Sequence, residues 1–93
     1  MSNYNPQQLI SQAIQHEDRG ENAEAIEDAF RAYAILKQEE GRDLSVVHGI
    51  LSNLVQKMGK MEFAKALLSI AQKDKEIQKA VMDGTWQQDF MGR

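Results

Sequence analysis

The sequence predicts an all-α domain made of two stacked antiparallel helical hairpins followed by a C-terminal capping helix. Apolar residues recur at steps of three and four along most of the chain, as they do on one face of an α-helix. Glycines stand where these patterns stop, at Gly20, Gly41, Gly59 and Gly84. No segment shows the apolar and polar alternation that is typical of a strand. A generic four- or five-helix bundle is the alternative architecture.

The first hairpin is expected over residues 6–40. Asn5 precedes Pro6, which suits an N-cap followed by proline at the first helical position, and this helix should end near Gly20. A second helix should begin near Asn22 and run to Gly41. Its apolar residues follow the helical period: Ala25, Ile26, Ala29, Phe30, Tyr33 and Leu36.

The second hairpin is expected over residues 44–73. Its first helix should begin near Asp43 or Ser45 and end at Gly59. The apolar stripe of that helix is Val47, Ile50, Leu51, Leu54, Val55 and Met58. The stripe predicted for the next helix is Met61, Ala64, Leu67, Leu68 and Ala71.

Residues 74–93 are expected to form a helical cap and tail. Asp74 suits the N-cap of a separate helix, but no glycine or proline interrupts the chain there, so residues 61–83 could also form one long helix. Trp86, Phe90 and Met91 are large apolar residues near a polar end of the chain. They could cap the last hairpin within the chain, or they could form an interface with another chain.

The two hairpins share a spacing of small residues. Counted from Gly20, alanines stand at positions +5, +9 and +12, and the corresponding residues counted from Gly59 are Ala64, Leu68 and Ala71. Small residues at these positions let the two helices of a hairpin approach closely. Over residues 9–71 this layout resembles the tetratricopeptide repeat, a helical hairpin of about 34 residues.

The resemblance implies that the chain binds a peptide or helix of a partner protein in a groove formed by the first helix of each hairpin. Polar residues on the outward sides of those helices are the candidate groove residues: Gln8, Gln12, Gln15, His16, His48, Asn53 and Lys57. Their amide, imidazole and ammonium groups suit hydrogen bonding to an extended peptide. The alternative is that they are ordinary solvated residues.

Charge and composition narrow the classes of protein that fit. The 93 residues include no cysteine, which excludes disulfides, thiolate metal sites and a cysteine nucleophile. Residues 1–45 hold nine acidic and four basic side chains, whereas residues 46–93 hold five and seven, a polarity that could guide self-association. No arginine cluster stands among aromatic residues, so nucleic-acid binding is not expected. Because neither a membrane-spanning run nor a secretory signal is evident, we expect a cytoplasmic protein.

No constellation of residues predicts catalysis. The sequence has no HExxH, no Glu-x-x-His pair and no glycine-rich phosphate loop, so we expect no catalytic, cofactor-binding or metal-binding residues. The expected function is a non-catalytic protein–protein interaction module of an adaptor, chaperone-like or regulatory kind. A self-assembling subunit of a homo-oligomer is the second hypothesis, and a metal-dependent enzyme is the third.

Overall fold

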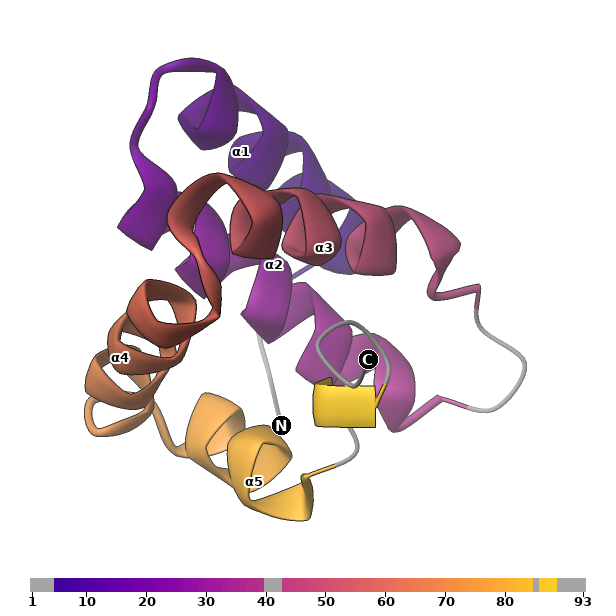
Figure 1. The fold of residues 1–93 in the computed structure, drawn as a ribbon. Helices are drawn as coiled ribbons and strands as arrows, with labels where there is room; N and C mark the ends of the chain where they lie inside the picture. Colours follow the sequence, from indigo (N-terminus) through magenta and orange to yellow (C-terminus); the bar gives the residue numbers. More distant parts are fainter. Residues whose placement is uncertain (1–4, 40–42, 85, 89–93) are drawn as a thin grey trace.

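The computed structural model describes residues 5–39, 43–84 and 86–88, and these residues form helices and turns without a strand (Figure 1). The all-α prediction is therefore confirmed. Residues 86–88 form a further short helical turn. The five α-helices are α1 (Pro6–Asp18), α2 (Asn22–Lys37), α3 (Ser45–Met58), α4 (Lys60–Ala71) and α5 (Lys75–Asp83).

Helix α2 is the centre of the fold. It contacts each of the other four helices, with α1 and α3 on one side of it and α4 and α5 on the other (Figure 1). Nine of its sixteen residues are buried for this reason. The Cα radius of gyration is 11.8 Å and the three principal extents are similar, so the helices surround α2 and do not extend as a row.

The hairpin of α1 and α2 forms close to its predicted position, although α2 ends at Lys37 and does not run on to Gly41. The Asn5 side chain accepts a hydrogen bond from the Gln7 backbone N–H at 2.9 Å, so the expected N-cap is present. Gly20 takes a φ of 78° in the turn, a conformation that favours glycine. Ala13 on α1 and Ala29 on α2 are fully buried. Small side chains at such positions let the two helices lie close together.

The second hairpin is built differently. Gly59 is the single residue between α3 and α4, with φ 89° and ψ 149°. A one-residue link does not fold α4 back along α3, and α4 contacts α3 far less than α2 contacts α1 (Figure 1). The two hairpins thus share a spacing of residues in the sequence but differ in how closely their helices pair.

The stripe predicted for α4 is wrong in two of its residues. The helix buries Phe63, Leu67 and Ala71, whereas Met61 and Leu68 are 74% and 54% exposed. The reason is that Phe63, which the predicted stripe omits, is on the side of α4 that meets the core. Leu68 is therefore on the surface, although its counterpart in the first hairpin spacing is a fully buried alanine.

Residues 61–83 form two helices, which resolves the alternative that the sequence leaves open. Helix α4 ends at Ala71 and α5 begins at Lys75. Asp74 caps α5, because its Oδ1 accepts hydrogen bonds from the backbone N–H groups of Glu76 and Ile77 at 2.9 and 3.3 Å. A polar cap therefore ends one helix and starts another without a glycine or a proline.

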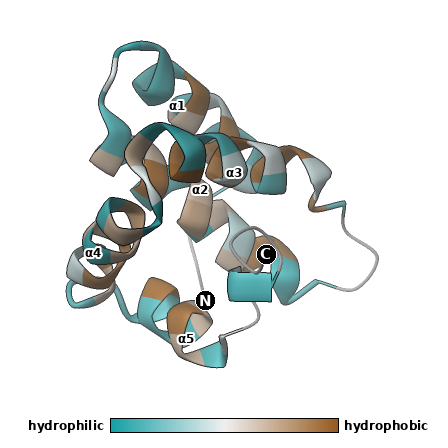
Figure 2. Ribbon diagram, viewed as in Figure 1, coloured by the Kyte–Doolittle hydropathy of each residue, from teal (hydrophilic) through white to brown (hydrophobic). Residues whose placement is uncertain are grey.

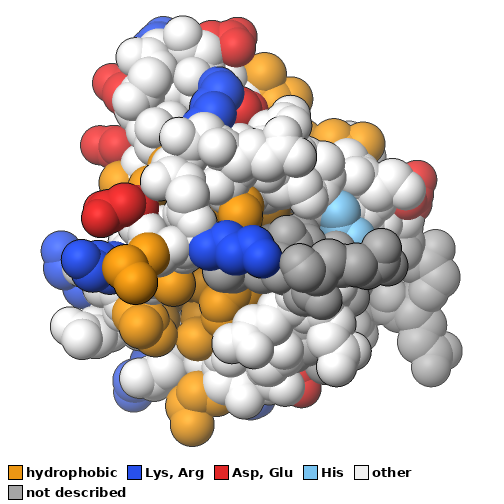
Figure 3. Space-filling model, viewed as in Figure 1, with side chains coloured by type: hydrophobic (Ala, Val, Ile, Leu, Met, Phe, Trp, Pro, Cys, Tyr) orange, Lys and Arg blue, Asp and Glu red, His pale blue; other side chains and the backbone are white. Residues whose placement is uncertain are grey.

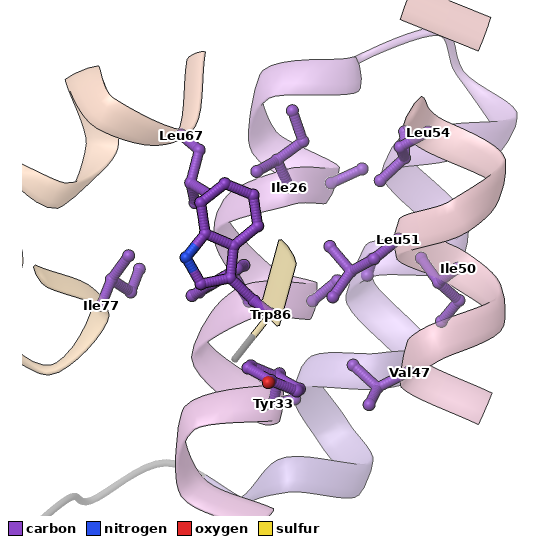
Figure 4. Packing of buried hydrophobic residues seen from close by; sticks show 14 of the residues in the cluster. Ile26, Tyr33, Val47, Ile50, Leu51, Leu54, Leu67, Ile77 and Trp86 are labelled. Atoms are coloured by element: carbon purple, nitrogen blue, oxygen red, sulfur yellow. The ribbon is translucent and has the colours of Figure 1, made fainter. Parts of the chain in front are cut away.

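Trp86 lies inside the chain's own core. Its side chain is 4% exposed and packs among residues of α2, α4 and α5 (Figure 4). Its ring centroid is 6.0 Å from that of Phe30 and 6.5 Å from that of Phe63. The indole N–H donates a hydrogen bond to the Val81 carbonyl at 2.9 Å. Of the two roles considered for this residue, the structure therefore supports the cap within the chain, while Phe90 and Met91 lie outside the described residues.

Hydrophobic residues recur on every helix between hydrophilic ones, as expected for amphipathic helices around one core (Figure 2). The core joins residues from all five helices and Trp86. Among the described residues, no helix combines the length and the apolar character needed to cross a membrane.

Candidate functional site

The seven polar residues proposed to line a groove do not act as one group. Four of them, Gln8, Gln12, Gln15 and Asn53, have exposed side chains. The other three, His16, His48 and Lys57, contact neighbouring helices or turns within the chain. These seven residues remain candidates only as a polar surface.

The three charged or aromatic members of that set connect parts of the fold. His16 Nδ1 lies 2.7 Å from the Glu21 carboxylate, across the turn between α1 and α2. Lys57 Nζ lies 3.1 Å from the carboxylate of Glu17, so this pair links α3 to α1. The His48 ring centroid lies 5.7 Å from that of Tyr33. Each contact is explained by packing between elements, without a ligand.

A charged pair joins α2 to the start of α5. Arg31 is 9% exposed, and its Nε donates a hydrogen bond to Asp74 Oδ2 at 2.9 Å. The Arg31 Nη2 group also pairs with this oxygen and lies 3.2 Å from the Glu27 carboxylate. Burial disfavours the ionised carboxylate, but the hydrogen bonds from Arg31 and from backbone N–H groups hold the pKa of Asp74 below its ordinary value. This network holds helices together and presents no reactive group.

A hollow of about 470 Å³ lies between α2 and α5. Its lining includes Ala34 and Ala80, whose small side chains leave space between the two helices. Lys37 also lines it, donates a hydrogen bond to the Tyr33 hydroxyl at 3.0 Å and lies 3.1 Å from the Asp83 carboxylate. Burial disfavours the charged amine, but these two partners raise the pKa of Lys37 above its usual value. The ammonium group at the hollow therefore already has partners within the chain.

The outer face of α4 carries apolar side chains that the described residues leave uncovered. Met61, Ala64 and Leu68 follow one another at helical spacing, so they form one line on that helix, which we call the α4 stripe. The two large side chains of the stripe are exposed, while Phe63 and Leu67 on another side of the same helix fill the core. Figure 3 shows hydrophobic side chains gathered over α4 and α5 on the face turned to the reader, with basic side chains beside them.

One lysine stands beside the α4 stripe, and two more follow α4 in the sequence. Lys65 is four residues after Met61 and three before Leu68, so it lies beside the stripe on the same helix. Lys73 and Lys75 lie where α4 ends and α5 begins, and both are exposed. Any group that covers the stripe therefore meets the positive charge of Lys65 at its edge.

The site was not recognised from the sequence, although one feature indicates it. Eight of the twelve residues of α4 are apolar, which is more than one core-facing side of a helix requires. The surplus identifies a helix with a second apolar face. In the fold, α5 adds another exposed apolar side chain, Met82.

Comparison with family models, curated proteins and solved structures found no match to this chain. The described part of the chain also contains no group of three or more His, Asp or Glu side chains that could hold a metal ion.

Proposed function

We propose that this chain is a non-catalytic protein-interaction domain that docks a helix of another protein on the outer face of α4. The observation that carries the proposal is the α4 stripe, in which Met61 and Leu68 are exposed at helical spacing although the same helix supplies other residues to the core. Clusters of exposed apolar residues on a folded domain mark interaction surfaces.

The composition of the stripe favours a helical partner. Met61 and Leu68 are seven residues apart, so they lie about 10 Å apart along the helix, with Ala64 between them. Two large residues on either side of a small one form a notch into which a side chain of a partner helix fits. Methionine adds an unbranched, adaptable side chain that tolerates different partner surfaces.

The other exposed apolar residues provide the comparison. Ile14 on α1 and Val46 on α3 are also exposed, but neither belongs to a line of exposed apolar residues on its helix. Single apolar residues of this kind are normal on protein surfaces and need no partner.

The proposal is tested by titrating the isotope-labelled chain with a synthetic amphipathic helical peptide and following the backbone NMR signals. The double variant Met61→Ser, Leu68→Ser should lose binding and keep the fold, because both side chains are exposed. The matched variant Ile14→Ser, Val46→Ser removes two exposed apolar side chains elsewhere and should bind like the natural chain. Equal binding by the two double variants would refute the proposed surface.

A further inference from the structure

We infer that the α4 stripe selects an acidic amphipathic helix, one with apolar residues at helical spacing and Asp or Glu beside them. This inference rests on the proposed function and adds the chemical class of the partner. It depends on the charges around the stripe and on how those charges are already paired within the chain.

The border of the stripe is basic. Residues 60–75 contain four lysines and two carboxylates. One of the carboxylates, Asp74, is turned to Arg31 and to the cap of α5. The other, Glu62, lies 3.9 Å from Lys65 at an exposed i,i+3 spacing, a contact that is weak in water.

Two lysines that follow α4 in the chain are also available to a partner. Within the described residues, Lys73 and Lys75 are exposed and form no ion pair. Carboxylates beside the apolar face of a docked helix could therefore pair with lysines that form no ion pair among the described residues. Complementary charge of this kind also directs the encounter and excludes partners of the wrong sign.

A second copy of this chain fits the stripe less well. If α4 packed on α4 of another copy about a two-fold axis near Ala64, each Lys65 would lie close to its own counterpart, and like charges would repel. The α4 stripe of one copy could instead pack on the acidic half of another copy. That half contains α1, whose only exposed large apolar residue is Ile14. An acidic helix from a different protein avoids both difficulties.

The test uses the full chain and three fluorescent helical peptides. Two share one apolar face and differ in the charged residues beside it, which are glutamates in one and lysines in the other; the third is the glutamate peptide with its apolar residues replaced by serine. In anisotropy titrations the glutamate peptide should bind roughly tenfold more tightly than the lysine peptide. This preference should shrink when salt is raised from about 0.05 M to about 0.5 M.

A matched pair of charge reversals locates the effect. Lys65→Glu should weaken binding of the glutamate peptide and reduce the preference for the glutamate peptide over the lysine peptide. Lys79→Glu makes the same change of net charge on α5, at the hollow between α2 and α5, and should leave the preference intact. Equal effects of the two variants would show a general charge effect and would overturn the inference.

The remaining outcomes separate this inference from the proposed function. If both charged peptides bind equally and the serine peptide does not, the inferred preference for an acidic partner is refuted, while docking on the α4 stripe stands. If no peptide binds, the proposed function itself fails. Two other results would also overturn the inference. If the chain binds vesicles of anionic lipid and not the peptides, the stripe serves a membrane. If light scattering detects self-association that Leu68→Ser abolishes, the stripe serves a second copy.

Discussion

Replacing Asp74 by Asn tests whether a charged pair holds α5 against α2. The asparagine side chain keeps an oxygen for the cap of α5, but it removes the negative charge that faces Arg31. The Glu27 carboxylate, at 3.2 Å, would remain as a charged partner of Arg31. Removing one member of a buried pair costs about 3–5 kcal/mol, and because Glu27 remains we expect a loss of about 2 kcal/mol in the free energy of unfolding.

The assay is urea unfolding followed by circular dichroism, with Asp43→Asn as the control. Asp43 accepts a hydrogen bond from the Ser45 backbone N–H at 2.9 Å at the start of α3, and it is exposed. The control therefore makes the same chemical change at a helix start that has no buried arginine. If Asp74→Asn and Asp43→Asn lower the unfolding midpoint equally, the reasoning about the buried pair is refuted.

The stability difference between the natural chain and Asp74→Asn should also depend on pH. The pKa of Asp74 is lowered in the folded chain, because hydrogen bonds from Arg31 and from the backbone outweigh the effect of burial. Its ionised form therefore adds stability that is complete above the pKa of the unfolded chain, about 3.9, and is lost as the pH falls through the lower folded value. We expect the difference in unfolding free energy between the natural chain and Asp74→Asn to be constant near neutral pH and to vanish in acid. A difference that persists unchanged in acid would contradict this account.

Four further predictions concern stability and are measured by urea or thermal unfolding. Trp86→Ala should cost about 3–5 kcal/mol at every protein concentration, because the indole packs within the chain; a midpoint that depends on concentration would point to a contact between chains. Ala29→Leu should cost about 2 kcal/mol by overpacking α1 on α2, whereas Leu68→Ala at the exposed counterpart position should change stability little, so similar losses would contradict the observed burial. Gly59→Ala should cost about 1–3 kcal/mol, since φ 89° and ψ 149° suit glycine almost alone. Gly49→Ala in α3 has open space for the added methyl group and should stabilise by about 0.5–1 kcal/mol, so a loss at this position would count against the helical assignment.

The helices could be predicted because local chemistry determines where they begin and end. Asn5 and Gly20 bound α1 in the structure, as their chemistry suggests. The break between α4 and α5 was harder to predict, because Asp74 acts as a cap only when its carboxylate turns back to the backbone of the next helix. Its pairing with Arg31, 43 residues earlier in the chain, strengthens that arrangement and is a contact that no local pattern reveals.

The surface chosen from the sequence and the surface chosen from the fold are different. The spacing of apolar residues shows which side chains share a face of a helix, but it does not show which face meets the core when a helix has two apolar faces. In α4 this choice is made by tertiary packing: Phe63 fills the space beside Trp86, with ring centroids 6.5 Å apart, and Met61 and Leu68 are then left outside. The polar residues of α1 and α3, which the repeat resemblance favoured as a groove, instead include several that pair with neighbouring elements. The proposed docking surface therefore rests on a helix that has more apolar residues than its core contact requires, and not on polar residues of helices that the core already uses.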